Sequence, residues 1–259
     1  MAHVDQHAPG AFSWIELATS DQTAAKHFYT ALFGWTSTDS PMGPNEFYTM
    51  FQLYDRNVGA AYTMRADEAS HGIPPHWNLY ITVASADEAT AKAVALGGSV
   101  LAGPFDVMTY GRMSVIADPT GAVFCTWEPK DHAGLGVISE AGALCWADLS
   151  TPDQAAAATF YKGLFGYAMP PGEGGYLHLQ NGEDFIGGIQ PPEHRAPHAP
   201  PHWLIYFQVA DCDHSTDRAK QLGANVYMAP MTMENIGRFA VMADPQGAVF
   251  ALFQPDMRR

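Results

Sequence analysis

Two acidic residues occupy matching places in a sequence that repeats itself, and they are the first candidates for chemistry. Glu16 follows Trp14 by two residues, and Asp148 follows Trp146 in the same way. On a strand, residues two apart point to the same side of the sheet, so each carboxylate would share a surface with an indole ring. A carboxyl group held among apolar groups has a raised pKa and can serve as a general acid or base. Alternatively, each carboxylate pairs with a cation and only stabilises the fold.

Two arginines are the second pair of candidates. Arg112 and Arg238 each follow a glycine at the start of a predicted hairpin. A guanidinium there could bind a carbonyl or carboxylate oxygen of a ligand and could stabilise an oxyanion beside Glu16 or Asp148. The same side chains could instead form ion pairs with those two carboxylates or bind backbone carbonyls. Both roles stay open at the level of sequence.

Other polar, reactive or aromatic residues fall on the same predicted strands or on the turns that join them. They could bind a ligand through hydroxyl, amide or imidazole groups, and aromatic side chains could form walls that stack on a planar molecule. Packing between the two halves is the alternative for the aromatic residues. Cys125 has no base beside it in sequence, which makes it a weak candidate nucleophile. The candidates for ligand binding are Trp14, Tyr48, Asn78, Tyr80, Tyr110 and Cys125 in the first half, and Trp146, Tyr176, His178 and Tyr206 in the second.

Internal repeats show which elements must position these residues. A WxEL motif returns as WxDL, and an FYxxLFG motif recurs, both at an offset of 132 residues (146 minus 14; 160 minus 28). A PHWxxY motif recurs at an offset of 126 (202 minus 76). The second half is therefore a shortened copy of the first, with the losses in loops. The motifs begin at Trp14, Phe28 and Pro75, and their copies begin at Trp146, Phe160 and Pro201.

A predicted β-hairpin closes each half. The segment from Gly111 to Phe124 returns as the segment from Gly237 to Phe250. Each copy has two apolar strands around an Asp-Pro-x-Gly turn, in which proline fixes φ and glycine can adopt a positive φ. The turn chemistry itself indicates only fold.

The order of elements within each half repeats again. A strand over 12–18 precedes a helix that Ser20 or Asp21 caps and Gly34 ends. Strands over 46–64, a strand over 77–83, a second helix and three further strands follow. We expect an α+β protein of four βαβββ units. One domain would span residues 10–130, a linker 131–142, and a second domain 143–259.

Composition limits the classes of partner. The chain has 259 residues, of which 47% are hydrophobic, and a formal net charge of -14. Such a surface repels nucleic acid and anionic membranes, so we expect a small-molecule ligand. The beginning of the chain does not resemble a signal peptide, and three cysteines without CxxC spacing suggest reduced thiols, so we expect a cytoplasmic protein. A monomer, as an internal pseudo-dimer, and a homodimer are both compatible with the repeats.

These motifs together resemble the vicinal oxygen chelate superfamily, which includes glyoxalase I, bleomycin-resistance proteins and extradiol dioxygenases. The resemblance covers nearly the whole chain, twice: FYxxLFG at a helix end, PHWxxY at a strand entry, and DPxGxxF in the closing hairpin. It implies tandem domains in which paired βαβββ units form cupped, partly open barrels of mixed sheet. In that family the cup holds the substrate, and metal-dependent members carry His, Gln or Glu ligands on its strands.

Carried over position by position, the resemblance implies that most metal ligands are missing. The ligand positions fall on Trp14, Asn78 and Cys125 in the first half, and on Trp146, Leu204 and Ala251 in the second. Indole, aliphatic and methyl groups do not coordinate divalent ions. We therefore expect no cofactor. A shifted alignment would leave one fallback set for a divalent metal, namely Glu16, His76 and Glu128.

Three functions follow as hypotheses. The chain could bind an aromatic or carbonyl-bearing metabolite without the usual metal, as a sequestering protein does. It could be a metal-free enzyme in which Glu16 or Asp148 moves a proton beside a carbonyl. It could be a metal-dependent lyase or dioxygenase with non-standard ligands.

Overall fold

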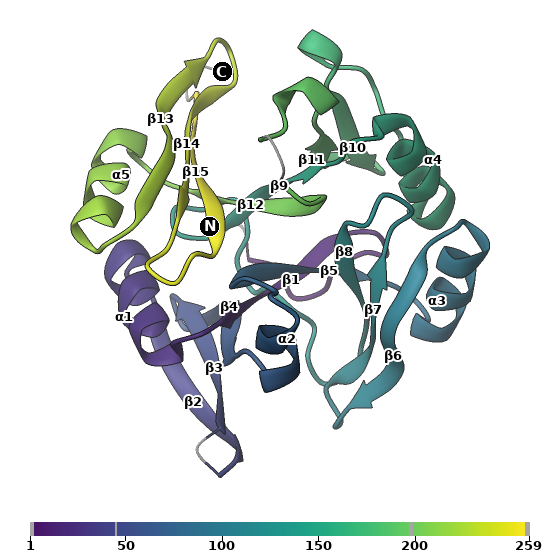
Figure 1. The fold of residues 1–259 in the computed structure, drawn as a ribbon, viewed down its shortest axis with the longest axis horizontal. Helices are drawn as coiled ribbons and strands as arrows, with labels where there is room; N and C mark the ends of the chain where they lie inside the picture. Colours follow the sequence, from purple (N-terminus) through teal and green to yellow (C-terminus); the bar gives the residue numbers. More distant parts are fainter. Residues whose placement is uncertain (1–2, 45, 197–198, 257–259) are drawn as a thin grey trace.

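The computed structural model describes residues 3–44, 46–196 and 199–256. Within these ranges lie fifteen strands, five α-helices and two short 3₁₀ turns. None of the helices in these ranges is long and apolar enough to cross a membrane. The first half, shown in purple to teal in Figure 1, contains β1 (Phe12–Thr19), α1 (Gln22–Phe33), β2 (Thr36–Gly43), β3 (Glu46–Leu53), β4 (Arg56–Thr63), α2 (Ala66–Ser70), β5 (His76–Thr82), α3 (Ala86–Ala95), β6 (Ser99–Val107), β7 (Gly111–Ala117) and β8 (Val123–Pro129).

The second half repeats this order with one reduced unit. Its elements are β9 (Leu144–Ser150), α4 (Gln154–Phe165), β10 (Leu177–Asn181), β11 (Asp184–Ile189), β12 (His202–Gln208), α5 (Cys212–Gln221), β13 (Asn225–Met233), β14 (Gly237–Ala243) and β15 (Val249–Pro255). Isolated bridges and a short 3₁₀ turn lie between α4 and β10, where the first half has β2. The third unit therefore has three strands where the sequence predicted four.

Each half forms one mixed sheet. The strand order is β2-β3-β4-β1-β5-β8-β7-β6 in the first sheet and β10-β11-β9-β12-β15-β14-β13 in the second. Antiparallel pairs β1–β5 and β9–β12 join the two units of each half. The predicted α+β fold, with tandem domains built on two mixed sheets, is confirmed.

The predicted caps place the first helix where the sequence indicated. The Asp21 carboxylate accepts a hydrogen bond from the backbone N–H of Ala24 at 2.9 Å, and Gly34 ends α1 with φ of 72°. Asp153 and Gly166 do the same for α4. A left-handed C-cap favours glycine because it has no Cβ.

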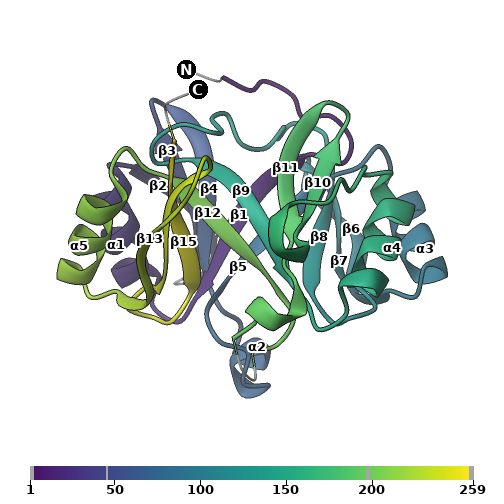
Figure 2. The ribbon, with the colours of Figure 1, turned by 90° about the horizontal axis from the view of Figure 1, so that it is seen from above.

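The helices of one half pack beside the helices of the other. Figures 1 and 2 show α1 next to α5 at one end of the molecule and α3 next to α4 at the other. Residues 131–142 connect the two sheets without any named helix or strand. They are not a loose linker, since Leu135 and Val137 are buried and the backbone N–H of Leu135 donates to Ser13 O at 2.7 Å.

Reciprocal hydrogen bonds tie the two halves together through the repeated motifs. Tyr29 of α1 donates its hydroxyl to Asp244 Oδ2 at 3.0 Å and accepts a hydrogen bond from Trp77 Nε1 at 3.1 Å. The matching group in the other direction is Tyr161, which donates to Asp118 Oδ2 at 3.1 Å and accepts from Trp203 Nε1 at 3.2 Å. The aspartate of each turn is thus bonded by the opposite half, so the turn stabilises the interface as well as the hairpin.

Candidate functional site

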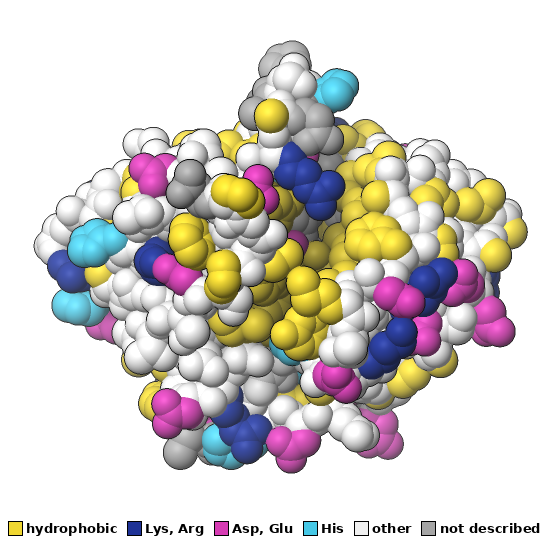
Figure 3. All heavy atoms as spheres, turned by 90° about the horizontal axis from the view of Figure 1, so that it is seen from below, with side chains coloured by type: hydrophobic (Ala, Val, Ile, Leu, Met, Phe, Trp, Pro, Cys, Tyr) yellow, Lys and Arg dark blue, Asp and Glu magenta, His cyan; other side chains and the backbone are white. Residues whose placement is uncertain are grey.

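The first cup is the face of the eight-stranded sheet that carries Glu16. Strand register pairs Glu16 with Asn78 and Trp14 with Tyr80 across β1 and β5, and Tyr80 with Cys125 across β5 and β8. Paired residues on neighbouring strands point to the same side, so these five predicted residues share one surface. Figure 3 looks onto this side of the molecule, where hydrophobic side chains gather in a hollow between the two arms of the sheet.

Glu16 is the chemically distinctive group of this surface. Its carboxylate is partly exposed, and Oε2 accepts a hydrogen bond from the Tyr80 hydroxyl at 2.7 Å. Burial raises the pKa of Glu16, while hydrogen bonds from Tyr80 and Tyr48 act in the opposite direction. A carboxylate can accept about four hydrogen bonds, so two phenols leave it able to accept more. Glu16 can therefore receive a hydrogen bond or a proton from a ligand.

Aromatic rings line one end of the first cup. The His132 ring lies edge-on to Trp14, with centroids 4.5 Å apart, and to Trp127 at 5.9 Å. Tyr80 contacts Trp127 at 6.3 Å. Trp14 and Tyr80 were predicted from the sequence as ligand-binding residues, whereas Trp127 and His132 were not. Trp127 lies two residues after Cys125, and this spacing on β8 was the signal that could have found it.

Tyrosines form the other side of the first cup. Tyr48 and Tyr62 face each other across β3 and β4, and Trp14 Nε1 donates to the Tyr48 hydroxyl at 3.3 Å. Burial raises the pKa of both phenols, so both remain protonated donors near neutral pH. Tyr62 was missed by the sequence analysis, although it alternates with Ala60 on a strand already predicted.

The second cup is the corresponding face of the seven-stranded sheet, and its carboxylate is saturated. Asp148 Oδ1 accepts hydrogen bonds from Tyr176 Oη at 2.5 Å and Trp146 Nε1 at 2.9 Å. Oδ2 accepts from Tyr206 Oη at 2.8 Å and Gln190 Nε2 at 3.1 Å. Asp148 is only 6% exposed. Burial raises its pKa, while the hydrogen bonds from these four donors act in the opposite direction. Three of these donors, Trp146, Tyr176 and Tyr206, were ligand-binding candidates in the sequence, whereas Gln190 was not predicted.

His178 also lies in the second cup, as expected. Its ring packs edge-on against Tyr176 at 5.0 Å and Phe185 at 5.3 Å. Its buried Nδ1 has no hydrogen-bond partner among the described residues. The rest of this surface is apolar, because Leu204 and Ala251 occupy the positions of Asn78 and Cys125.

The two arginines proposed as catalytic lie elsewhere. Arg112 binds Asp87 through Nε at 2.7 Å and Nη2 at 3.1 Å, and Arg238 binds Asp213 in the same way at 2.6 and 2.8 Å. Neither has a hydrogen bond or ion pair with Glu16 or Asp148 in the part of the chain described. The expected oxyanion role and the expected pairing with the cup carboxylates are therefore both corrected. The guanidinium groups bind Asp87 and Asp213 instead, which lie in the first turns of α3 and α5.

Tyr110 is also placed outside the cup. It lies in the turn between β6 and β7, where its N–H donates to Val107 O at 2.9 Å, and its side chain is 50% exposed. A tight turn between antiparallel strands points its central side chains to solvent, which explains the difference from the expectation.

The fallback metal set does not assemble. Tyr80 lies opposite Cys125, so His76 at the start of β5 and Glu128 near the end of β8 are about seven residues apart in register, roughly 23 Å. Glu128 Oε2 accepts a hydrogen bond from Ala86 N at the start of α3, and His76 Nδ1 bonds Pro74 O. Residues 3–44, 46–196 and 199–256 contain no group of three His, Cys, Asp or Glu side chains arranged to hold a metal ion.

The donors that do surround Glu16 fit a divalent ion poorly. Burial raises the pKa of the Cys125 thiol, which keeps it protonated, and the Tyr80 phenol is likewise neutral. One carboxylate beside neutral phenols, a thiol and an amide lacks the charged or imidazole ligands that such ions require.

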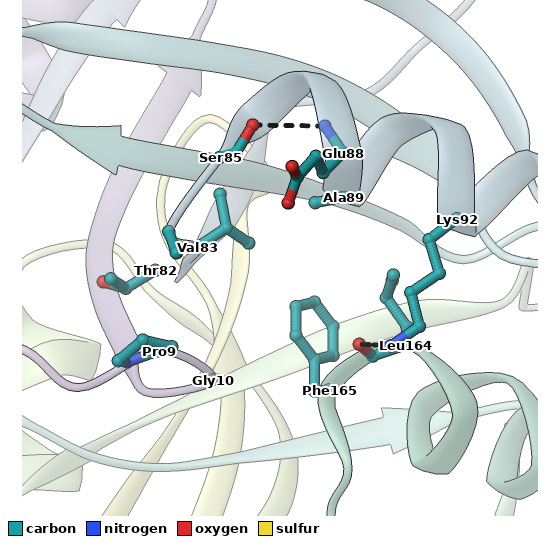
Figure 4. A pocket seen from close by; sticks show the side chains of 11 residues that line it. Pro9, Gly10, Thr82, Val83, Ser85, Glu88, Ala89, Lys92, Leu164 and Phe165 are labelled. Atoms are coloured by element: carbon teal, nitrogen blue, oxygen red, sulfur yellow. Dashed lines mark hydrogen bonds between the residues drawn. The ribbon is translucent and has the colours of Figure 1, made fainter.

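A crevice between the two halves lies away from both cups. It has a volume of about 260 Å³ and is bordered by α3 and the end of α4 (Figure 4). Ser85 caps α3 through Glu88 N, and Lys92 Nζ donates to Leu164 O at 3.1 Å. Ser85 and Lys92 thus bond within the protein, whereas Thr82 Oγ1 has no hydrogen-bond partner among the described residues. We assign the crevice to packing between the halves.

Comparisons with known proteins agree with this architecture. Residues 11–126 match the model of the Glyoxalase/Bleomycin resistance protein/Dioxygenase superfamily, and residues 146–253 match a Glyoxalase-like domain. The chain is 38% identical to "Putative glyoxylase CFP32" of Mycobacterium bovis, over 96% of this chain and 97% of that protein. It is 33% identical to "Anthracycline biosynthesis protein DnrV" of Streptomyces peucetius, over 95% of this chain and 94% of that protein.

Solved structures with the same fold are more distant in sequence. The Mn(II)-bound glyoxalase from Novosphingobium aromaticivorans has a TM-score of 0.67 at 15% identity, covering 95% of this chain and 82% of its own. The 2,3-dioxygenase LapB from Pseudomonas sp. KL28 has a TM-score of 0.65 at 14% identity, covering 96% of this chain and 93% of its own. At such identities the likeness concerns the fold alone.

Proposed function

The chain belongs to the glyoxalase/bleomycin resistance protein/dioxygenase superfamily, and on that premise we propose that its first cup binds a planar aromatic or carbonyl-bearing metabolite. One observation carries the proposal. Glu16 is a partly exposed carboxylate with unused acceptor capacity, set in a cup walled by Trp14, Tyr80 and Trp127. Aromatic walls bind flat molecules, and a single polar group fixes their orientation.

The first cup suits this role better than the second. Asp148 already accepts four hydrogen bonds, so a ligand would have to displace a protein donor to reach it. Displacement would leave a buried donor unpaired, at a cost of about 1–3 kcal/mol. Glu16 imposes no such cost on an arriving ligand.

The relatives support the ligand class. Two proteins 33% identical to this chain carry names from anthracycline biosynthesis, and those at 38% identity carry the name of a glyoxylase. Both names are compatible with a ligand that is aromatic or carries a carbonyl group, and the first cup has side chains that suit such a ligand. A cytoplasmic setting belongs to the same proposal, since all three cysteines are free.

A metal-free enzyme is the second candidate, favoured by the raised pKa of Glu16. The ionised carboxylate would take a proton from the carbon beside a ligand carbonyl, and the carbonyl oxygen would gain the negative charge of the enolate. The Tyr62 hydroxyl would donate to that oxygen in place of Glu68, in the role first considered for Arg112 and Arg238. Delivery of the proton from Glu16 to a different carbon of the conjugated enolate would complete an isomerisation. We derive no step through a divalent ion, because the donor set around Glu16 does not fit one.

Binding of two matched probes tests the main proposal. Quenching of tryptophan fluorescence by 2-naphthol and by its methyl ether compares ligands that differ only in a hydroxyl donor. Wild type should bind naphthol about tenfold more tightly, as expected for a hydrogen bond to a charged acceptor. Glu16→Gln should remove most of this preference, whereas Glu88→Gln on α3 should retain it. Equal affinity for the two probes in wild type, or no quenching by either, would contradict the proposal.

Exchange of hydrogen for deuterium separates the two candidates. If Glu16 moves a proton, a bound aryl methyl ketone in D₂O should lose its hydrogens beside the carbonyl faster with wild type than with Glu16→Gln. Binding without enhanced exchange would leave the sequestering function alone.

A further inference from the structure

Arg65 carries a guanidinium without a partner in the described part of the chain. Four other arginines there are bonded: Arg56 to Asp5, Arg112 to Asp87, Arg238 to Asp213, and Arg195 to Ala199 O. Arg218, the remaining described arginine without a side-chain bond, lies on α5. In an acidic protein of net charge -14, an unpaired guanidinium beside a cup is unusual.

Hydrogen bonds place the backbone of Arg65 at the rim of the first cup. Glu68 Oε2 accepts a hydrogen bond from Arg65 N at 2.8 Å, and Glu68 Oε1 accepts one from the Tyr62 hydroxyl at 3.3 Å. The preceding residue, Met64, donates its N–H to Thr19 O at the end of β1. Arg65 is therefore attached to the two strands that carry Glu16 and Tyr62.

The electrostatics agree with this placement. The positive charge of Arg65 lowers the pKa of Glu16, in opposition to burial, so the guanidinium acts on the cup. Arg65 is the only Lys or Arg between residues 57 and 91, so no other cation lies on this part of the chain. The Glu68 carboxylate accepts two hydrogen bonds, and its negative charge offsets part of the field of Arg65.

The second cup lacks this feature. Arg195, in the loop that follows β11, bonds Ala199 O within the same loop and so is directed into its own backbone. Asp148 is saturated by four neutral donors. The two halves have therefore diverged at both the carboxylate and the cation.

We propose that the ligand of the first cup is a planar organic acid. Its hydroxyl or enol group donates a hydrogen bond to Glu16, and its carboxylate forms an ion pair with the guanidinium of Arg65. This inference rests on the function proposed above and adds the charge of the ligand to it. A molecule with its carboxylate near Glu16 would be repelled, so the two groups must lie at separate places on the ring system. Arg65 thus selects the acid over a neutral analogue and sets the direction in which it enters.

Two isosteric probes test the charge. The first is 6-hydroxy-2-naphthoate, whose hydroxyl and carboxylate lie at opposite ends of the ring system, and the second is its amide, 6-hydroxy-2-naphthamide. Both are titrated by tryptophan quenching at low ionic strength. Wild type should prefer the carboxylate about tenfold, as a charge-assisted hydrogen bond to guanidinium predicts. Arg65→Gln should reduce that ratio to near one without weakening the amide, and Arg218→Gln is the matched control that keeps it. Added salt should lower the preference of wild type and of Arg218→Gln, and should leave the ratio of Arg65→Gln near one.

The outcomes separate the two proposals. Equal binding of both probes to wild type, or an unchanged ratio in Arg65→Gln, would overturn the acid inference and leave the cup function standing. If neither naphthoate, naphthamide nor naphthol binds, the proposed function itself fails and the inference with it. A preference that survives high salt would also count against Arg65 pairing.

Discussion

The two cup carboxylates show how one sequence position can take different roles within a single chain. Glu16 and Asp148 match in the repeat, yet the first is partly exposed with two phenol donors, Tyr80 and Tyr48, and the second is buried among four donors. Side-chain length contributes, because glutamate reaches one methylene further from the strand. The number of unused acceptor sites, more than burial, distinguishes a group that can meet a ligand from one that stabilises the fold.

Binding at Glu16 should depend on pH in one direction. Its pKa lies above the ordinary value of 4.5 because of burial, and the ionised form accepts a stronger hydrogen bond from a hydroxyl than the protonated form does. Affinity for 2-naphthol should therefore rise as pH increases through the raised pKa and should be weakest below it. Fluorescence titrations from about pH 4 to pH 8 would follow the change. Glu16→Gln should give a flat profile, and a fall in affinity with rising pH would refute the assignment.

Asp148→Asn should destabilise the protein more than Glu16→Gln does. An amide offers one acceptor oxygen and an NH₂ group that faces the hydroxyl, indole and amide donors now bonded to Asp148. Leaving buried donors unpaired costs about 1–3 kcal/mol, whereas the partly exposed Glu16 should cost less than about 1 kcal/mol. Urea unfolding of both variants measures the difference. Equal losses would mean that the two cups are equally saturated.

At the scale of elements, the repeated motifs are explained by the interface between the halves. The tyrosine of FYxxLFG, the tryptophan of PHW and the aspartate of DPxG meet as Tyr29, Trp77 and Asp244 across the interface. From sequence, the DPxG turn predicted only a hairpin, and the aromatic residues could serve either as ligand walls or in packing between the halves. The structure places Trp77 in the interface and Trp14 in the cup.

Removing the hydroxyl of either tyrosine should weaken the interface. Tyr29→Phe and Tyr161→Phe each delete a bond to a buried aspartate, which still accepts bonds within its own turn. We expect a loss of about 1–2 kcal/mol for each and nearly additive losses in the double variant, because the two sites share no partner. Urea midpoints give the values. Tyr54→Phe, at a side chain 59% exposed, is the control that should change little.

Local patterns predicted most elements but not all of them. The strand of Glu16, the capped helix α1 and the closing hairpin follow from alternation, Asp21 and Asp-Pro-x-Gly. By contrast β2 was not predicted, since Thr36–Gly43 is polar and largely exposed and pairs only along one edge of the sheet. In the site, Gln190 and Tyr62 escaped because their roles arise from neighbours on other strands, which spacing within one strand cannot reveal.

At the scale of the whole molecule, the two halves share one hydrophobic core. Three pairs of phenylalanine rings meet across the halves. Their ring centroids are 6.1 Å apart for Phe28 and Phe250, 4.8 Å for Phe33 and Phe207, and 6.1 Å for Phe124 and Phe160. The sequence predicted two domains, at 10–130 and 143–259, and the family models match each half in turn. It could not show that each half buries its helix side against the other, because such contacts join residues far apart in the chain.

A shared core predicts that the halves unfold together. Differential scanning calorimetry of the intact chain should give a single transition whose calorimetric and van't Hoff enthalpies agree, since neither sheet can lose its partner and keep its apolar face buried. A ligand bound only in the first cup should then raise the midpoint temperature of the whole transition. At a free ligand concentration one hundred times its dissociation constant, the free energy of unfolding should increase by about 2.7 kcal/mol. Arg218→Gln, outside cup and interface, should leave both results unchanged. Two transitions, with only the first-half one shifted by ligand, would instead mean that each sheet is stable alone and that the aromatic contacts between them contribute little.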